Sequence, residues 1–281
     1  MVGTQKGDFT LDHHPLLPGT PALGSVAVIP WDSATFGFTV GDYKLAERGH
    51  GTIDADTCCT LLEDWATANN CELISCDVPA DHHDRIALLS SLGFVFVDFR
   101  LRVTLPQLRM TTLPGGRIPV RPAEQEDGAD IERIARTAFH HGRYHADPRF
   151  PGVLADLRYQ RWITNALTDP GLGEVVYVIG PPGSVRGFYH AVVTNGLAHL
   201  RLAAVDADSR GGIVGFNLYV GMLEVLREMG ARQATGVIST ANVEVMNVFG
   251  FLGFRFSHPE AEFHWHARQA RHLIGGNKGG V

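Results

Sequence analysis

The sequence lacks any apolar run long enough to cross a bilayer, which excludes a membrane-spanning chain. It also lacks an excess of positive charge. Its formal net charge of −6 argues against a protein that binds nucleic acid without sequence preference. Residues 1–20 contain no continuous apolar stretch, so we expect no secretory signal peptide. These absences together predict a cytoplasmic protein without a membrane or nucleic-acid partner.

Cysteine is scarce, and the spacing of its four residues matches no zinc-binding pattern. We interpret all four as reduced thiols of a protein core, namely Cys58, Cys59, Cys71 and Cys76. Histidine is plentiful with 14 residues, but its adjacent pairs lack the i,i+4 spacing of helical metal ligands. The pairs are His13-His14, His82-His83 and His140-His141. The sequence therefore predicts no metal site.

The composition that remains is that of a globular protein, with 44% hydrophobic and 19% charged residues. A length of 281 residues allows one or two domains. Apolar periodicity predicts helices and strands in alternation through both halves, which indicates an α/β fold. The order helix, strand, helix, Leu-Gly-Phe, strand occurs at 61–97 and again at 223–256. Two similar halves are the simplest interpretation of this repeat.

Composition changes along the chain suggest the domain boundaries. Residues 1–24 are rich in Pro and Gly and predict an irregular arm. Residues 25–105 form a partial first domain, 106–117 a linker and 118–268 the second domain, and 269–281 form a flexible tail. Each domain is expected to hold a central mixed sheet flanked by helices.

The stretch from His199 to Gly215 has the order expected of an anion-binding element. It reads as a strand, an acidic turn, the loop Arg210-Gly211-Gly212 and the start of a helix. Glycine lets the backbone approach a ligand closely, and a helix N-terminus offers unpaired N–H groups. The alternative is an ordinary strand-to-helix connection with turn glycines. The first half has no counterpart of this loop.

A hairpin precedes this stretch, because Asn195-Gly196 is a strong two-residue turn signal. A turn there pairs His190 with Arg201, and Val192 with His199. One face would carry the core residues Tyr189, Ala191, Val193, Ala198, Leu200, Leu202 and Ala204. The other face would gather His190, His199 and Arg201, where the guanidinium would keep His190 neutral. This face is either part of a site or an ordinary solvated surface.

The residues from Leu202 to Gly215 resemble the acyl-CoA motif of the GCN5-related N-acetyltransferase (GNAT) family. The match extends to the segment from Asn242 to Phe254, which is similar to the second CoA segment of that family. Trp31-Asp32-Ser33 and the segments from Arg143 to Pro151 and Tyr159 to Asn165 resemble sugar-nucleotide acetyltransferases of the dTDP-fucosamine acetyltransferase type. Those have a GNAT-like first domain without a CoA loop of its own.

The resemblance implies a role for each of these segments. The backbone of Leu202, Ala203, Ala204 and Val205 would pair with the pantetheine arm, at a splay between strands. The amides of Arg210, Gly211, Gly212, Ile213, Val214 and Gly215 would hold the pyrophosphate, and Asn242 and Phe249 would complete the cofactor site. His199 occupies the place of an acidic base, with His190 as a second candidate. Arg143, Tyr144, His145 and Arg201 would bind the acceptor.

The chain departs from the family pattern at two positions. Ile213 stands at the first glycine of the loop, and Phe249 stands where a tyrosine often protonates the departing thiolate. The resemblance thus implies transfer of an acetyl or other short acyl group from acyl-CoA to an amine, such as a nucleotide-linked amino sugar, with no metal. The alternatives are a chain that binds acyl-CoA without transfer, or O-acylation or decarboxylation on the same fold. The sequence leaves open whether the protein is a homodimer.

Overall fold

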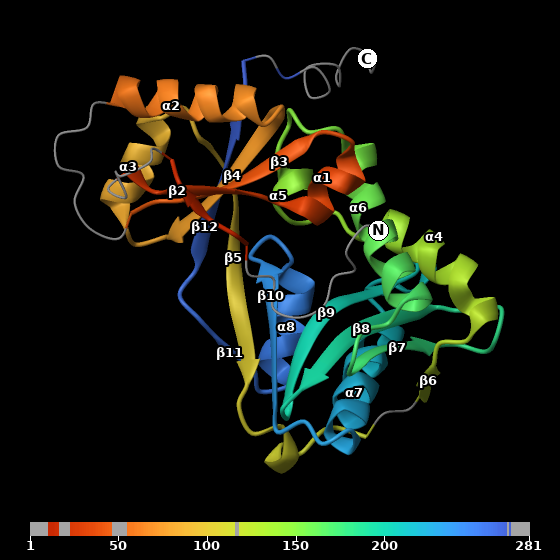
Figure 1. Ribbon diagram of the computed structural model, residues 1–281. Helices are drawn as coiled ribbons and strands as arrows, with labels where there is room; N and C mark the ends of the chain where they lie inside the picture. Colours follow the sequence, from red (N-terminus) through yellow and green to blue (C-terminus); the bar gives the residue numbers. More distant parts are fainter. Residues whose placement is uncertain (1–10, 17–22, 47–54, 116–117, 269, 271–281) are drawn as a thin grey trace. The chain divides into compact units, whose positions relative to one another are not determined.

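The computed structural model describes residues 11–16, 23–46, 55–115, 118–268 and 270 (Figure 1). These residues form two compact units. Unit 1 consists of Leu101–His141 and Asp156–Ser257. Unit 2 consists of the described residues up to Arg100, with Gly142–Ala155 and the described residues from His258 onward. Most of the expected arm and of the tail 269–281 lies outside the described residues.

The units interleave along the chain, unlike the contiguous domains 25–105 and 118–268 expected from the sequence. Two pieces of the second half belong to unit 2: the segment 142–155 and the strand β12 (Glu260–His266). β12 lies between β4 (Cys71–Pro79) and β5 (Val95–Leu105) and pairs antiparallel with both. Backbone pairing over these strands therefore assigns the last strand to the first half of the chain.

Unit 2 has a mixed sheet with the order β1-β2-β3-β4-β12-β5, where β5 contributes residues up to Arg100. Its other strands are β1 (His14–Pro15), β2 (Ser25–Val28) and β3 (Thr39–Lys44). Its helices are α1 (Pro30–Phe36), α2 (Ala55–Ala68), α3 (His83–Ser91), α5 (Arg143–Ala146) and the first turn of α6 (Gly152–Thr168). Ala261, Phe263 and Trp265 of β12 join one core with α2 and α3. A second core packs Phe36 and Tyr144 with Phe150.

Unit 1 has a mixed sheet with the order β5-β10-β9-β8-β7-β6, and β11 pairs with β5. Its strands are β6 (Val120–Pro122), β7 (Glu174–Ile179), β8 (Gly187–Thr194), β9 (Leu197–Val205), β10 (Gln233–Ser239) and β11 (Arg255–Phe256). Its helices are α4 (Gly128–Ala138), the rest of α6, α7 (Ile213–Glu228) and α8 (Val243–Phe251), with short 3-10 turns η2 (Leu108–Met110), η3 (Gln125–Asp127) and η4 (Ala207–Ser209). One core joins α7 and α8 to the sheet, and another joins α4 and α6 to it.

The predicted repeat is present in the backbone. The helices α3 and α8 both end in Leu-Gly-Phe, with φ of 83° at Gly93 and 85° at Gly253. The Phe94 N–H donates to the Leu89 carbonyl, and the Phe254 N–H donates to that of Phe249, at 3.0 and 2.9 Å. Both helices thus end in the same left-handed glycine turn, which satisfies their last carbonyls.

Several local expectations are met and others are modified. Cys58, Cys71 and Cys76 are buried thiols, Cys59 is half-buried, and burial raises the pKa of Cys71 to about 12. The expected linker 106–117 is described up to residue 115 and contains η2, whose Leu108 is fully buried in unit 1. Of the helices in the described part of the chain, none has the length and apolar character needed to cross a bilayer.

Candidate functional site

The strands β9 and β10 of unit 1 separate halfway along their length. Their parallel pairing covers Leu197 to Leu200 on β9 and Gln233 to Gly236 on β10. Beyond it β9 continues to Val205 and β10 to Ser239. The far edge of β9 remains paired with β8 as far as Val205. An open edge of this kind presents backbone donors and acceptors to a ligand that has amides of its own. The predicted residues Leu202 to Val205 all lie on it.

A β-bulge on β9 lies beside the splay and corrects the predicted hairpin register. The Asn195-Gly196 turn forms as expected, with φ of 53° and 80°. The predicted pairing then holds from Thr194 to Ala191 and shifts between Ala191 and His190. His190 therefore pairs with Leu202, and the predicted pair with Arg201 is wrong. A bulge places two residues opposite one, so every side chain after it changes face.

Because of this change of face, side chains of β9 beyond the bulge lie on the opposite side of the sheet from the one predicted. Leu202 and Ala204 contact the core under α4 and α6, and not the core that holds Tyr189 and Ala191 as predicted. Ala203 takes the face of α7 instead. Because the local bend accompanies the end of the β9–β10 pairing, the bulge and the splay occur at the same point of the strand.

The loop that follows β9 has the geometry of an anion-binding element. Gly211 has φ of 64°. The N-cap of α7 is Gly212, which has no side chain that could cap the helix. The first N–H groups of this 16-residue helix are thus left for a ligand or solvent. The Arg210 guanidinium donates to the Thr137 carbonyl at 2.6 Å, at the last turn of α4, which fixes the loop. Ile213, the departure from the family motif, is 53% exposed.

The polar face of the hairpin contains a pair that the sequence analysis missed. Nε2 of His190 donates to Oε1 of Glu174 at 2.6 Å, and the other carboxylate oxygen accepts the Gly171 N–H at 2.6 Å. Burial alone would raise the pKa of Glu174, but the hydrogen bonds from His190 and Gly171 outweigh it and lower the pKa. Arg201 adds to this lowering. The position of Glu174 at the start of a strand that pairs with His190 was the signal available in the sequence.

The two candidate bases differ in accessibility. The His190 side chain is 1% exposed, and its Nδ1 has no hydrogen-bond partner among the described residues. His199 is half-buried and lies across from Val192 on β8 and beside Thr235 on β10. His199 directly precedes Leu200, the last residue of β9 that pairs with β10, and it is the more exposed of the two candidates.

Asn242 and Phe249 occupy structural positions on α8. The Asn242 side chain accepts the Val245 N–H at 3.3 Å and caps the helix. Phe249 is 3% exposed and packs edge-on against Tyr219 of α7, with ring centroids 5.3 Å apart. Burial raises the pKa of Tyr219. Tyr219 of α7 therefore supplies the phenol that packs against Phe249, the position where the family pattern often has a tyrosine.

The predicted acceptor residues are divided between the units. Arg201 lies in unit 1, and Arg143, Tyr144 and His145 lie on α5 in unit 2. The Tyr144 hydroxyl donates to Asp32 at 2.6 Å, and the Arg143 guanidinium donates to the same carboxylate at 3.3 Å. These contacts fix α5 on α1, so both side chains support the fold of unit 2.

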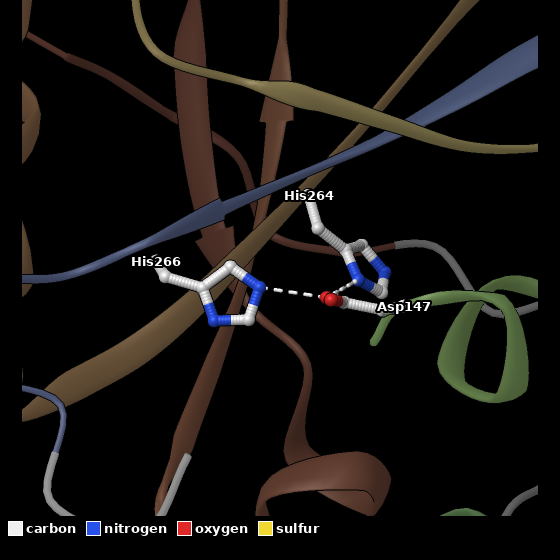
Figure 2. Close-up of side chains that lie close together, drawn as sticks. All are labelled: Asp147, His264 and His266. Atoms are coloured by element: carbon white, nitrogen blue, oxygen red, sulfur yellow. Dashed lines mark hydrogen bonds and ion pairs between the residues drawn. The ribbon is translucent and has the colours of Figure 1, made fainter. Parts of the chain in front are cut away.

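A second cluster in unit 2 has the residue types of a metal site. Figure 2 shows Asp147 between His264 and His266, with Oδ2 accepting from both rings at 2.8 and 2.6 Å. Burial alone would raise the pKa of Asp147, but the two hydrogen bonds hold it well below its usual range. Burial lowers the pKa of His264 to about 4. Asp147 is therefore ionised and His264 neutral at pH 7.

Comparison with known proteins places the fold. No protein-family model matches the sequence. The spore coat polysaccharide biosynthesis protein SpsD of Bacillus subtilis (strain 168) is 26% identical over 151 residues, which is 53% of this chain. The chain spans about half the length of that relative, 52%.

The similar solved structures are GNAT proteins at low identity. A GCN5-related N-acetyltransferase from Sphaerobacter thermophilus superposes with a TM-score of 0.62 at 14% identity, over 90% of this chain and 79% of that one. A tandem GNAT protein from the clavulanic acid biosynthesis pathway gives 0.51 at 14%, over 86% and 78%. The chain therefore has the mixed α/β fold of the GCN5-related N-acetyltransferases, as the sequence analysis predicted.

Proposed function

We propose that the protein transfers a short acyl group from acyl-CoA to an amine. One observation carries the proposal: the open edge of β9 leads directly into a glycine loop and an uncapped helix N-terminus. A molecule that combines two amide groups with a pyrophosphate matches this sequence of features, because the amides pair with a strand edge and the pyrophosphate binds a helix N-terminus. CoA is such a molecule.

In this proposal the residues from Leu202 to Val205 bind the pantetheine amides through their backbone. The N–H groups of Arg210, Gly211, Gly212, Ile213, Val214 and Gly215 surround the pyrophosphate. Ile213 is the first residue of α7, so its N–H belongs to the first turn of the helix, and its side chain is exposed. Asn242 and Phe249 then act by holding α8 in place, through its cap and its core contact.

The chemistry is a direct displacement at the thioester. The amine nitrogen attacks the carbonyl carbon, the carbon–sulfur bond breaks, and the nitrogen loses one proton. His199 is the proposed base because it is half-buried beside the splay. His190 is fully buried, so we assign it the second place, as a group that passes the proton toward Glu174. Tyr219 packs against Phe249 and is the proposed donor of a proton to the thiolate.

The proposed acceptor is a small amine, with a nucleotide-linked amino sugar as the first choice. Its support is the likeness to a polysaccharide biosynthesis protein. Arg201 is the proposed acceptor contact in unit 1. We propose no metal and no nucleic acid in this reaction.

A second candidate function is acyl-CoA binding without transfer, which the burial of Phe249 favours. Calorimetry with acetyl-CoA, followed by measurement of thiol release with a panel of amines, separates the two. We expect release of one thiol per acylated amine, with the product identified by mass. Binding without release supports the second candidate, and absence of binding contradicts both.

The variant His199→Gln tests the base. We expect turnover to fall by about 10²- to 10⁴-fold, the usual contribution of general-base catalysis, with unchanged CoA affinity. The exposed residue His83 of α3 provides the control His83→Gln, for which we expect normal turnover. Full turnover by His199→Gln would exclude this residue as the base.

A further inference from the structure

β12 has a polar face that is buried, and this calls for a physical explanation. Side chains alternate along a strand, so Glu262, His264 and His266 point to one side, away from the apolar residues Phe263 and Trp265. Glu262 is 6% and His264 0% exposed, and the His266 side chain is 6% exposed. Buried ionisable groups are costly unless they are paired or bind a ligand.

The geometry around Asp147 brings three ligand atoms to one point. His264 and His266 are two residues apart on a strand, which directs both rings to the same side. Oδ2 of Asp147, Nδ1 of His264 and Nε2 of His266 all lie within 4.8 Å of one another. All three residues belong to unit 2, and Figure 2 shows the carboxylate entering between the rings from the segment 142–155.

We propose that Asp147, His264 and His266 bind one divalent transition-metal ion of the Zn²⁺ type. Ligand atoms about 2.1 Å from a tetrahedral ion lie roughly 3.4 Å apart. The carboxylate oxygen, now 2.8 and 2.6 Å from the ring nitrogens, would therefore move outward, and the two ring nitrogens, now within 4.8 Å, would take up the same separation. Each imidazole must then carry its proton on the other nitrogen. Two imidazoles and a carboxylate favour zinc, iron or cobalt over Ca²⁺ or Mg²⁺, which prefer oxygen ligands.

The surrounding charges permit a cation at this place. Arg143 is the cation whose charge acts on His264. Its guanidinium is itself paired with Asp32 at 3.3 Å and with Glu262 at 3.7 Å. The charge of Arg143 is thus compensated by two carboxylates. Arg149 is a second cation at this place, with Nε 4.0 Å from Oδ1 of Asp147, and its side chain is 47% exposed, so solvent screens its charge.

An ion would change the role of each nitrogen of the fully buried His264 ring. Without an ion, Nδ1 donates to Asp147, and Nε2 has no hydrogen-bond partner among the described residues. With an ion, Nδ1 would be the ligand atom and the ring proton would move to Nε2. The ion would fasten the segment 142–155 to β12, which is a structural role.

The test uses the full chain, stripped with a chelator and dialysed, and then titrated with Zn²⁺ in a calorimeter. We expect binding of one equivalent and a rise in Tm. Co²⁺ in place of Zn²⁺ should give the intense visible bands of a four-coordinate site with nitrogen ligands. Absence of binding at one equivalent, or a weak six-coordinate Co²⁺ spectrum, overturns the proposal.

Two variants identify the ligands, and one excludes surface binding. Loss of an outer-shell partner already costs about 10- to 100-fold in metal affinity, so His266→Gln and Asp147→Asn should each weaken Zn²⁺ binding by more than about 100-fold. The double variant His82→Gln/His83→Gln removes an exposed histidine pair and should bind Zn²⁺ normally. Zn²⁺ binding by the His266 and Asp147 variants with the affinity of the unmodified chain overturns the proposal. If either variant fails to fold, the Co²⁺ spectrum of the unmodified chain decides the outcome.

Discussion

Gly211 provides the sharpest test of the anion-binding loop, because its neighbour Gly212 is a matched control. Gly211 has φ of 64°, in the left-handed region, and a Cβ built on it would meet no atom within 4 Å. The variant Gly211→Ala is therefore opposed by backbone conformation alone. Gly212 has φ of −106° and ψ of 179°, which any residue adopts. A Cβ there would meet the Ser209 carbonyl oxygen at 3.4 Å, an ordinary contact.

The expected magnitudes follow from these angles. A left-handed conformation costs a non-glycine residue roughly 1–2 kcal/mol. If the variant loop relaxes to negative φ in the free protein, CoA binding must restore the left-handed form. The affinity for CoA then falls by about 5- to 25-fold, at about 1.4 kcal/mol per tenfold. Gly212→Ala should change the affinity by less than about twofold, because the backbone angles of Gly212 suit alanine and the added Cβ makes only an ordinary contact.

Calorimetric titration with CoA checks both values, since it needs no acceptor and no turnover. A third variant, Gly211→Asn, should fall between Gly211→Ala and the unmodified chain, because asparagine tolerates the left-handed region better. Equal losses in the two alanine variants would refute the reasoning. So would a CoA affinity in Gly211→Ala equal to that of the unmodified chain.

Three further predictions concern unit 1. The variant Glu174→Gln should lower turnover by at least about 10-fold with unchanged CoA affinity, because an amide cannot fix the proton of His190 on Nε2. Thiol release measures the turnover. The variant Glu132→Gln on α4 is the control. The Arg121 guanidinium lowers the pKa of Asp127. The stability that this pair contributes is therefore present above the unfolded pKa of about 3.9 and is lost as the pH falls through the pKa of the folded protein. The variant Asp127→Asn should accordingly flatten the acid limb of a curve of Tm against pH. The variant Leu108→Ala should lower the free energy of unfolding in urea by about 2–5 kcal/mol, because Leu108 is fully buried. Met110 is 80% exposed, so Met110→Ala should leave this free energy almost unchanged. Equal effects of the two variants would contradict the packing of η2.

Local patterns predicted much of the fold correctly. The Asn195-Gly196 turn forms where its two residues require positive φ. The Leu-Gly-Phe repeat also appears as the same helix ending in both halves. These features depend on residues within a few positions of one another, so a single sequence contains the information that determines them.

Features that depend on long-range register could not be predicted in this way. The bulge on β9 shifts the pairing of His190 by one residue, and no glycine or proline marks it. The contact of Glu174 with His190 follows from the pairing of β7 with β8. The turn signal Pro181-Pro182-Gly183 joins these strands, but unlike a two-residue hairpin signal it does not fix their register. The site was therefore predicted as a set of segments, while its polar partners required the structure.

The histidines near the end of the chain illustrate the same limit. A search for helical i,i+4 spacing missed His264 and His266, because their chelating geometry is that of a strand. Their partner Asp147 lies 117 and 119 positions away. Only the pairing of β12 with β4 and β5, together with the placement of 142–155 in unit 2, brings the three side chains together.

The position of β12 also has a consequence for synthesis on the ribosome. β12 is an interior strand between β4 and β5, yet it is translated about 155 residues after β5 ends. At roughly 5–20 residues per second, the early strands wait about 8–30 s for the strand that separates them. During this interval β4 and β5 have unpaired edges, which are prone to association with other chains. The sheet of unit 2 can therefore close only after almost all of the described chain has been synthesised.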